Sequence, residues 1–179
     1  MTSEPRVIDV PGVPRFEVAP HHCFACGTLN QHGLGLLLHV EPERAWTEFQ
    51  LDRRFEGWEG MAHGGILCTV LDEVMAWSLA GADNWGVTAR MSVSFRKPAS
   101  LDTPLRAEGW VTRERRRLVD TAARVVDQTT GEELTTAEGT YLAADETRKA
   151  ALRRRYGFRG PIETTESGLP DSVDKAGPA

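Results

Sequence analysis

A histidine and two glycines precede a long apolar stretch of the chain, and this arrangement could bind an oxyanion. His63, Gly64 and Gly65 open a segment that has no further Gly or Pro up to about residue 80, which favours a helix. The first N–H groups of a helix have no partner within it and carry the positive end of its dipole, and glycines let a ligand approach the backbone. A carbonyl that gains negative charge during nucleophilic attack would be stabilised there.

Two carboxylates follow within this predicted helix. Asp72 lies nine residues after His63, and Glu73 comes directly after Asp72. A carboxylate in a mostly apolar helix is costly to bury unless it is solvated or has a function. The two side chains point about 100° apart around a helix, so periodicity does not decide between them. The simpler interpretation is a tight glycine loop with both carboxylates facing solvent or an arginine, and metal ligation by His63 and Asp72 has less support.

A Cys-x-x-Cys pair, Cys23 and Cys26, offers two sulfur ligands at a spacing that zinc sites use. The nearby histidines that could complete such a site are His21, His22 and His32. The sequence has no second Cys-x-x-Cys. We therefore assign no metal to this segment, and the sequence leaves open whether Cys23 and Cys26 bind one.

Length and composition bound the class of protein. The chain has 179 residues, 40% of them hydrophobic, and a formal charge of −5, which predicts one globular domain and argues against a dedicated nucleic-acid-binding protein. No stretch approaches the roughly 20 apolar residues of a membrane-spanning helix. The N-terminus lacks the basic start and apolar stretch of a secretory signal, and three cysteines are too few for a disulfide framework. We therefore expect a protein of the cytoplasm that binds neither nucleic acid nor membrane.

The remaining patterns predict an α+β fold, in which a long curved antiparallel sheet wraps around one central helix. Apolar runs on both sides of an E-P-E-R turn predict an early hairpin, and later period-two runs with short turns predict a meander. The expected strands cover residues 34–40, 45–51, 87–95, 105–114, 118–128 and 134–143.

The segments that flank this domain, which we place at residues 33–144, are expected to bury little. Residues 1–32 are expected to be an irregular lead-in because four prolines interrupt regular pairing, namely Pro5, Pro11, Pro14 and Pro20. An arginine-rich segment at 145–159 predicts a short basic surface helix. Residues 160–179 are expected to be disordered.

The strand expected at 87–95 has two faces of different character. Its apolar residues alternate and should face the core, and they are Val87, Ala89, Met91, Val93 and Phe95. Thr88 falls on the other face with Arg90 and Ser92. The hydroxyl of Thr88 therefore points away from the helix unless the first residues of the strand twist or bulge.

Three stretches of the sequence match motifs that occur together in one protein family. They are C-F-A-C-G-T-L-N-Q-H-G-L at 23–34, F-E-G-W-E-G-M-A-H-G-G-I at 55–66 followed by L-D-E at 71–73, and T-A-R-M-S-V-S-F-R-K-P at 88–98. Together they resemble hotdog-fold acyl-CoA thioesterases, in the branch with phenylacetyl-CoA thioesterases and the mitochondrial long-chain acyl-CoA thioesterase. The resemblance covers about residues 23–143. The order of elements in that fold, hairpin, helix and meander, agrees with the elements predicted above.

The resemblance implies roles for residues of a catalytic site. Asp72 matches the family's catalytic carboxylate, which acts as general base on a water molecule or as nucleophile. Gly65 matches the backbone donor to the thioester oxygen, and His63 matches the residue that orients or polarises that group. Thr88 matches a hydroxyl that holds the attacking water or the carboxylate. Glu73 stays the alternative carboxylate, because some hotdog thioesterases use glutamate.

The resemblance also implies an assembly. In such enzymes the active site lies between two subunits, with the His-Gly-Gly segment from one and the helical carboxylate from the other. A homodimer, or a homotetramer built as a dimer of dimers, is therefore implied, with the strand at 87–95 joined to its symmetry mate. No metal and no organic cofactor is implied, coenzyme A being only part of the substrate, and the cysteine loop is expected to pack near the pocket. Many relatives have Asn where this chain has Gly57, so that substrate contact is not carried over.

Further contacts with the substrate are expected from loops and turns. Asn30 is expected to shape the acyl end, and Gly64 to let the substrate approach the backbone. The residues that could pair with the phosphates of coenzyme A are Arg96, Lys97, Arg115 and Arg116, although merely solvated side chains explain these basic residues equally well.

We therefore expect hydrolysis of an acyl-CoA or a related thioester to a free acid and a thiol. One alternative is a non-catalytic hotdog module that binds or senses acyl-CoA, and a hotdog dehydratase would need a different His/Asp pattern. The sequence leaves open both the acyl group and whether coenzyme A or an acyl carrier protein carries it.

Overall fold

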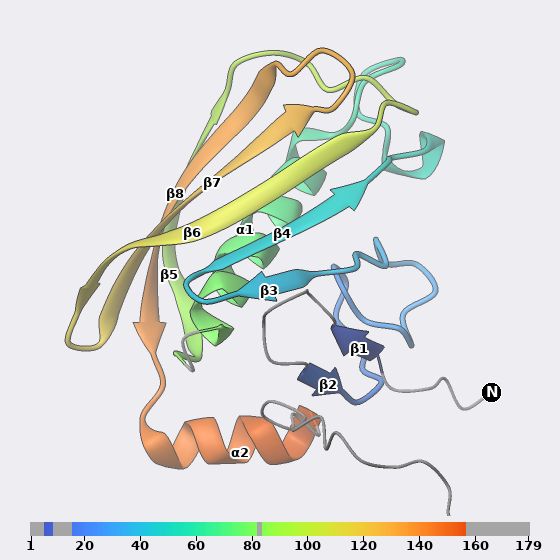
Figure 1. Cartoon of the computed structure of the whole chain (residues 1–179). Helices are drawn as coiled ribbons and strands as arrows, with labels where there is room; N and C mark the ends of the chain where they lie inside the picture. Colours follow the sequence, from blue (N-terminus) through green and yellow to red (C-terminus); the bar gives the residue numbers. More distant parts are fainter. Residues whose placement is uncertain (1–5, 9–15, 82–83, 157–179) are drawn as a thin grey trace, which may run out of the picture.

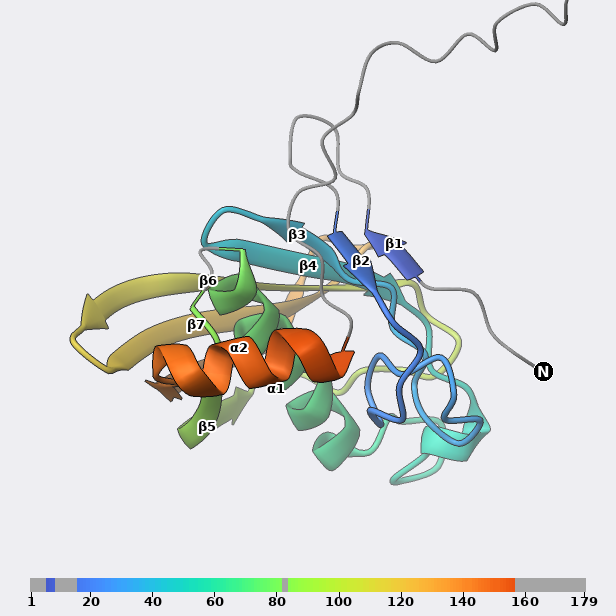
Figure 2. The same cartoon turned by 90° about the horizontal axis from the view of Figure 1, so that it is seen from below.

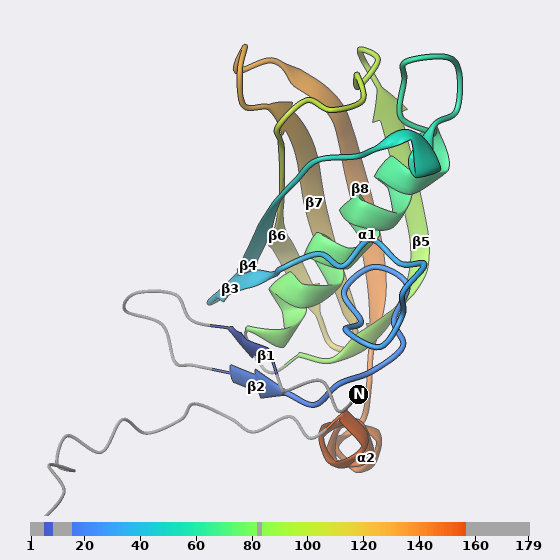
Figure 3. The same cartoon turned by 90° about the vertical axis from the view of Figure 1, so that its right-hand side faces the viewer.

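The computed structural model describes residues 6–8, 16–81 and 84–156. Its main feature is a six-stranded antiparallel sheet in the order β3-β4-β6-β7-β8-β5, which curves around one helix, α1 (Figures 1 and 3). The elements of this layer are β3 (His39–Glu41), β4 (Arg44–Phe49), α1 (Gly64–Ala80), β5 (Gly86–Phe95), β6 (Leu105–Arg115), β7 (Leu118–Asp127) and β8 (Glu133–Ala143). The α+β fold with a long sheet around a central helix is therefore confirmed.

Helix α1 packs along the concave face of the sheet and supplies much of the core (Figure 3). The residues Val70, Leu71, Val74 and Met75 are inaccessible to solvent, because the helix is apolar around most of its circumference. Gly109 on β6 permits the close approach, since a Cβ there would lie 2.7 Å from the main-chain carbon of Val74. The main chains of β6 and α1 therefore pack directly against each other at this point.

The first expected strand, at residues 34–40, is mostly loop. Only β3 pairs with β4, across a turn in which Glu43 has a φ of 58°. The residues before β3 form a loop that buries Leu36 and Leu38 and leaves Leu37 47% exposed, and in it the Leu36 N–H donates to the carbonyl of Ala25 at 2.9 Å. Leu36 and Leu38 therefore fill part of the core while the backbone of the run pairs with the cysteine-containing loop.

The irregular lead-in expected at 1–32 contains a pair of short antiparallel strands, β1 (Arg6–Ile8) and β2 (Phe16–Val18). This expectation is wrong in part because the four prolines flank these two strands and do not lie within them. A short 3-10 helix, η1 (Arg53–Phe55), lies before α1.

The basic segment after the sheet forms helix α2 (Glu146–Tyr156), which lies beyond the end of β8 near the C-terminal end of α1 (Figures 1 and 2). The disorder expected at residues 160–179 concerns a segment outside the described residues. No helix in the described part of the chain is long and apolar enough to cross a bilayer.

Candidate active site

The carboxylate of Asp72 lies where α1 faces strands β5 and β8, and two hydroxyl groups hold it. The Thr88 Oγ1 and the Tyr141 hydroxyl each donate to Asp72 Oδ1 at 2.7 Å. The Tyr141 hydroxyl also lies 3.0 Å from the main-chain oxygen of Asp72. Both donors use the same carboxylate oxygen, so neither of these two hydrogen bonds occupies Oδ2. The half-buried Asp72 is thereby fixed in one orientation while keeping acceptor capacity.

A β-bulge brings Thr88 to this carboxylate. The register between β5 and β8 shifts between Thr88 and Arg90, so that Thr88 pairs with the buried Tyr141 and Met91 pairs with Gly139. The extra residue reverses the alternation at the start of β5. Thr88 therefore faces the helix, on the same side of the sheet as Met91.

The same bulge makes the expected core face of β5 wrong at its first residues. Val87 pairs with Leu142 on the outer side and is 53% exposed. Phe95, at the other end of the strand, is 55% exposed although it lies on the helix side. β5 is an edge strand with one neighbour in the sheet, so only Met91 and Val93 of the expected face pack against the core.

Sequence reasoning did not single out Tyr141. Its side chain is fully buried near the C-terminal end of β8, and burial, together with the charge of Asp72, raises the pKa of its hydroxyl. Tyr141 is therefore a neutral donor to the carboxylate. The available signal was a tyrosine at a core-facing position of a strand, because a buried phenol needs a hydrogen-bond partner.

Glu73 lies on a different side of α1 from Asp72. Its Oε1 accepts a hydrogen bond from the indole N–H of Trp77 at 2.9 Å, and the Cys23 sulfur lies 3.9 Å from its Oε2. Burial, and then the nearby Cys23, raise the pKa of Glu73 to about 7. The two carboxylates therefore have separate surroundings, with hydroxyl groups around Asp72 and sulfur and indole groups around Glu73.

The start of α1 is open to solvent, and the side chain of His63 caps it. His63 Nδ1 accepts a hydrogen bond from the Gly65 N–H at 3.0 Å, and both residues are exposed. Gly57 packs against this cap, because a Cβ on Gly57 would lie 2.9 Å from the His63 Cα. A larger residue at position 57 would therefore displace His63.

A cavity of about 300 Å³ lies beside the helix start and joins Gly64 to the end of β5. The ring of Phe95 would lie 3.2 Å from a Cβ on Gly64. Because Gly64 has no side chain, this ring can pack closely against the start of α1. Arg96 and Lys97 line the same cavity. Arg96 pairs with Glu133 at 3.2 Å between Nε and Oε1, and Lys97 pairs with Glu132.

The other expected substrate contacts lie elsewhere in the protomer. Arg115 pairs with Asp120 at 2.5 Å, and Arg116 follows in the β6–β7 turn with a φ of 53°. This turn is at the opposite end of the sheet from the start of α1 (Figure 1). Asn30 bonds within its own loop, since its Oδ1 accepts from the His32 N–H at 3.1 Å and its amide donates to the His22 carbonyl.

Comparisons with known proteins agree with this architecture. Residues 59–134 match the family model described as the thioesterase superfamily. A crystal structure described as a thioesterase superfamily protein aligns with a TM-score of 0.63 at 23% identity, over 68% of this chain and 60% of that one. The PaaI protein of the Escherichia coli phenylacetic acid degradation operon aligns with a TM-score of 0.59 at 16% identity, over 63% of this chain and 81% of that protein.

A Streptococcus mutans protein bound to acetyl-CoA gives a TM-score of 0.58 at 19% identity, over 61% of this chain and 88% of its own. No curated protein matches the sequence significantly. The alignment with the thioesterase superfamily protein spans less than two thirds of that protein's length. The resemblance to hotdog-fold thioesterases stated from the sequence is confirmed by the family model and by these structures.

Proposed function

We propose that this protein hydrolyses an acyl-CoA, or a related acyl thioester, to the free carboxylic acid and the thiol. The observation that carries the proposal is the Asp72 carboxylate, held by Thr88 and Tyr141 on one oxygen within a fold shared with thioesterases. The acetyl-CoA bound to the Streptococcus mutans structure supports a coenzyme A ester as the substrate class.

In the proposed reaction Asp72 Oδ2 acts on the thioester carbonyl carbon in one of two ways. As general base it takes a proton from a water molecule, which attacks the carbon. As nucleophile it attacks directly, and water then hydrolyses the resulting anhydride. In both routes the C–S bond breaks, the thiolate takes up a proton, and the acid leaves. Every group that acts in these steps is a side chain, a main-chain amide or water.

The developing oxyanion would be stabilised by the amide of Gly65 at the start of α1. In the structure this N–H donates to His63 Nδ1. The thioester oxygen must therefore replace the imidazole as acceptor, and His63, which lies in the exposed cap, is free to turn toward the substrate. His63 would then orient the bound group, while the exposed amide keeps a partner in both states.

Two subunits are needed to bring the amide and the carboxylate together. Asp72 follows Gly65 by seven residues on one helix, which corresponds to about 10 Å along the axis. One carbonyl cannot contact both groups of the same chain at hydrogen-bond distance. We therefore propose a homodimer in which Gly65 of one protomer faces Asp72 of its partner, and this unit could pair again to a tetramer.

Strand β5 is the surface we assign to this dimer. It is ten residues long, lies at the edge of the sheet and exposes Val87 and Phe95. An unpaired apolar edge is a liability that pairing with a symmetry mate removes. We place the protein in the cytoplasm, where its thiols stay reduced.

The coenzyme A phosphates are assigned to the cavity beside Gly64, where Arg96 and Lys97 extend from the end of β5. Their present partners are the half-buried Glu133 and the exposed Glu132. Exchange of such solvent-exposed ion pairs for phosphate contacts costs little. Arg115 and Arg116 lie at the other end of the sheet and are assigned no phosphate contact in the same protomer.

A thiol-release assay over a panel of acyl-CoAs tests the proposal. Short, long, branched and aromatic acyl groups are offered in turn, and the free thiol is measured spectroscopically. Release of coenzyme A in stoichiometric amounts with the acid supports the hydrolase. Binding of acyl-CoA without release in every case contradicts it and indicates the binding module. The same panel presented on an acyl carrier protein identifies the carrier.

A further inference from the structure

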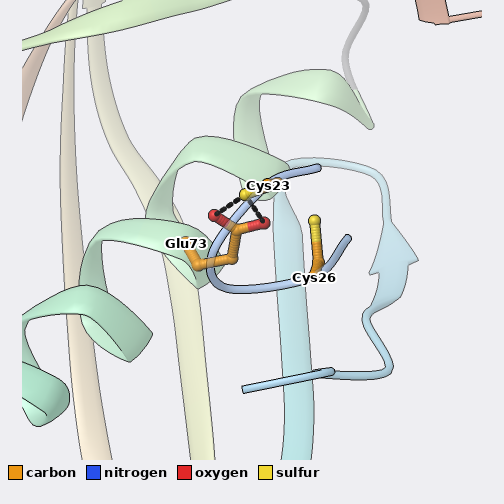
Figure 4. A group of neighbouring side chains, drawn as sticks. All are labelled: Cys23, Cys26 and Glu73. Atoms are coloured by element: carbon orange, nitrogen blue, oxygen red, sulfur yellow. Dashed lines mark hydrogen bonds between the residues drawn. The ribbon is translucent and has the colours of Figure 1, made fainter. Parts of the chain in front are cut away.

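The loop that contains the Cys-x-x-Cys motif meets helix α1 at a cluster of three potential ligand atoms (Figure 4). The sulfur atoms of Cys23 and Cys26 and a carboxylate oxygen of Glu73 all lie within 4.8 Å of one another. Cys26 is buried, and the other two residues are half-buried. The Cys23 sulfur lies 3.9 and 4.0 Å from the two oxygens of Glu73.

The backbone of the loop holds the two sulfurs on the same side. The Gly27 N–H donates to the Cys23 carbonyl at 3.0 Å, which closes a tight turn around the motif. A Cβ on Gly27 would lie 2.5 Å from the main-chain nitrogen and oxygen of Cys23, so only glycine fits.

We propose that Cys23, Cys26 and Glu73 form a binding site for one zinc ion per chain. Two thiolates and a carboxylate repel one another when ionised, and a divalent cation between them converts this repulsion into attraction. Zinc binds thiolate and carboxylate at about 2.3 and 2.1 Å in a tetrahedron, which separates ligand atoms by about 3.6 Å. The spacing between Cys23 and Glu73 needs only a small contraction. Binding releases the thiol protons.

Glu73 supplies the ligand that the sequence alone did not reveal. A second Cys-x-x-Cys is missing, and the third ligand comes instead from a helix fifty residues further along the chain. The indole N–H of Trp77, which donates to Glu73 Oε1, orients the carboxylate as a second layer of contacts does in zinc sites.

Water is assigned to the fourth position. The site opens on a cavity of about 260 Å³ that His21 also lines. His21 Nδ1 accepts from the Cys23 N–H at 3.3 Å, so in this tautomer Nε2, which lies 4.0 Å from the Cys26 sulfur, carries the proton and cannot bind metal. The zinc would tie the N-terminal loop to the turn of α1 that also carries Asp72, without contacting the hydroxyls that hold Asp72.

Cobalt titration of the reduced, metal-free full-length protein tests this site without any measurement of turnover. Tetrahedral Co²⁺ bound to thiolate gives a sulfur-to-metal charge-transfer band and strong visible bands. We expect one equivalent to saturate these bands and Zn²⁺ to displace it. Failure to develop a charge-transfer band in the wild-type protein overturns the proposal and leaves the proposed hydrolysis untouched.

Variants assign the ligands. We expect the charge-transfer band to disappear in Cys23→Ser and Cys26→Ser and to remain in Cys68→Ser, which changes a half-buried thiol of α1 outside the cluster. Trp77→Phe should weaken binding by about 10- to 100-fold, as loss of a second-layer contact does. If Cys23→Ser is folded by circular dichroism and binds cobalt as tightly as the wild type does, the assignment of the ligands is overturned. A stable Cys23–Cys26 disulfide that withstands reduction and excludes metal also overturns it.

Discussion

Replacing Tyr141 by phenylalanine removes one of the two hydroxyls that hold Asp72 and leaves the buried ring in place. The Tyr141 and Thr88 hydroxyls both donate to Asp72 Oδ1 at 2.7 Å. A hydrogen bond to a charged group contributes about 1.5–3 kcal/mol, and each 1.4 kcal/mol corresponds to about a tenfold change in rate. If the full contribution positions the carboxylate for reaction, kcat falls by about 10- to 150-fold.

The effect should appear in kcat, because both hydroxyls contact the reacting carboxylate and neither is expected to contact the acyl group. Thr88→Val should behave in the same way. Because both donors share one oxygen, the double variant should lose less than the product of the two single effects. Steady-state thiol release with one acyl-CoA, at concentrations from well below to well above KM, measures all three.

Thr140→Val provides the matched control. Thr140 lies next to Tyr141 on β8 and donates to Asp120 at 3.0 Å, a carboxylate outside the candidate site. We expect this variant to keep wild-type kcat. If folded Tyr141→Phe and Thr88→Val both turn over within twofold of the wild type, the hydrogen bonds to Asp72 have no part in the reaction and the reasoning is refuted.

Three further predictions concern the helix start, the core and the outer face of the sheet. Gly65→Val keeps the main-chain N–H but places a branched side chain beside it, which should block the approach of the carbonyl and lower thiol release by about 10²–10³-fold, the range for loss of an oxyanion donor, while circular dichroism stays native; undiminished turnover contradicts the role of this amide. Gly109→Ala should destabilise the protein by about 1–3 kcal/mol in denaturant unfolding, because its Cβ would lie 2.7 Å from the main chain of α1; unchanged stability contradicts the close packing. Burial opposes ionisation of Glu108, but hydrogen bonds from Arg44 and Arg124 outweigh it and lower its pKa. Ionised Glu108 therefore contributes stability above the ordinary glutamate pKa, and this is lost as the pH falls through the lowered one. Glu108→Gln should cost about 1–2 kcal/mol at pH 7 and progressively less as the pH is lowered below the ordinary glutamate pKa, and a cost that does not change with pH excludes the ion pair as the cause.

The fold was predictable because its signals are periodic. A helix with apolar residues around most of its circumference and three long alternating runs at 105–114, 118–128 and 134–143 differ from the observed elements by at most a residue or two at each end. Local sequence did not reveal that the first apolar run is mostly loop, since the burial of Leu36 and Leu38 does not require strand pairing.

The site was predictable only in part, because its contacts join residues far apart in the chain. The nine-residue spacing between His63 and Asp72 could be predicted because His63 caps the helix that contains Asp72. The bulge that turns Thr88 toward Asp72 depends on the pairing of β5 with β8, which alternation along one strand cannot show. Tyr141 reaches Asp72 across sixty-nine residues, and no local pattern marks that contact.

The same limit applies to the two carboxylates. Periodicity left Asp72 and Glu73 equivalent, and their tertiary partners distinguish them. Asp72 meets two hydroxyl groups, whereas Glu73 meets Cys23 and Trp77. The contact of Glu73 with Cys23 joins residues fifty positions apart, so the local sequence could not distinguish the two carboxylates.

Thiol release by Asp72→Asn, compared with the wild type on the best substrate of the panel, tests the central claim most directly. An asparagine oxygen can still accept from both hydroxyls, so the change removes the charge and basicity of the side chain with little change in shape. We predict a fall in kcat of at least about 10²-fold, the low end for loss of a general base, with the same oligomeric state as the wild type by light scattering. A folded Asp72→Asn protein with wild-type kcat would contradict the assignment of Asp72.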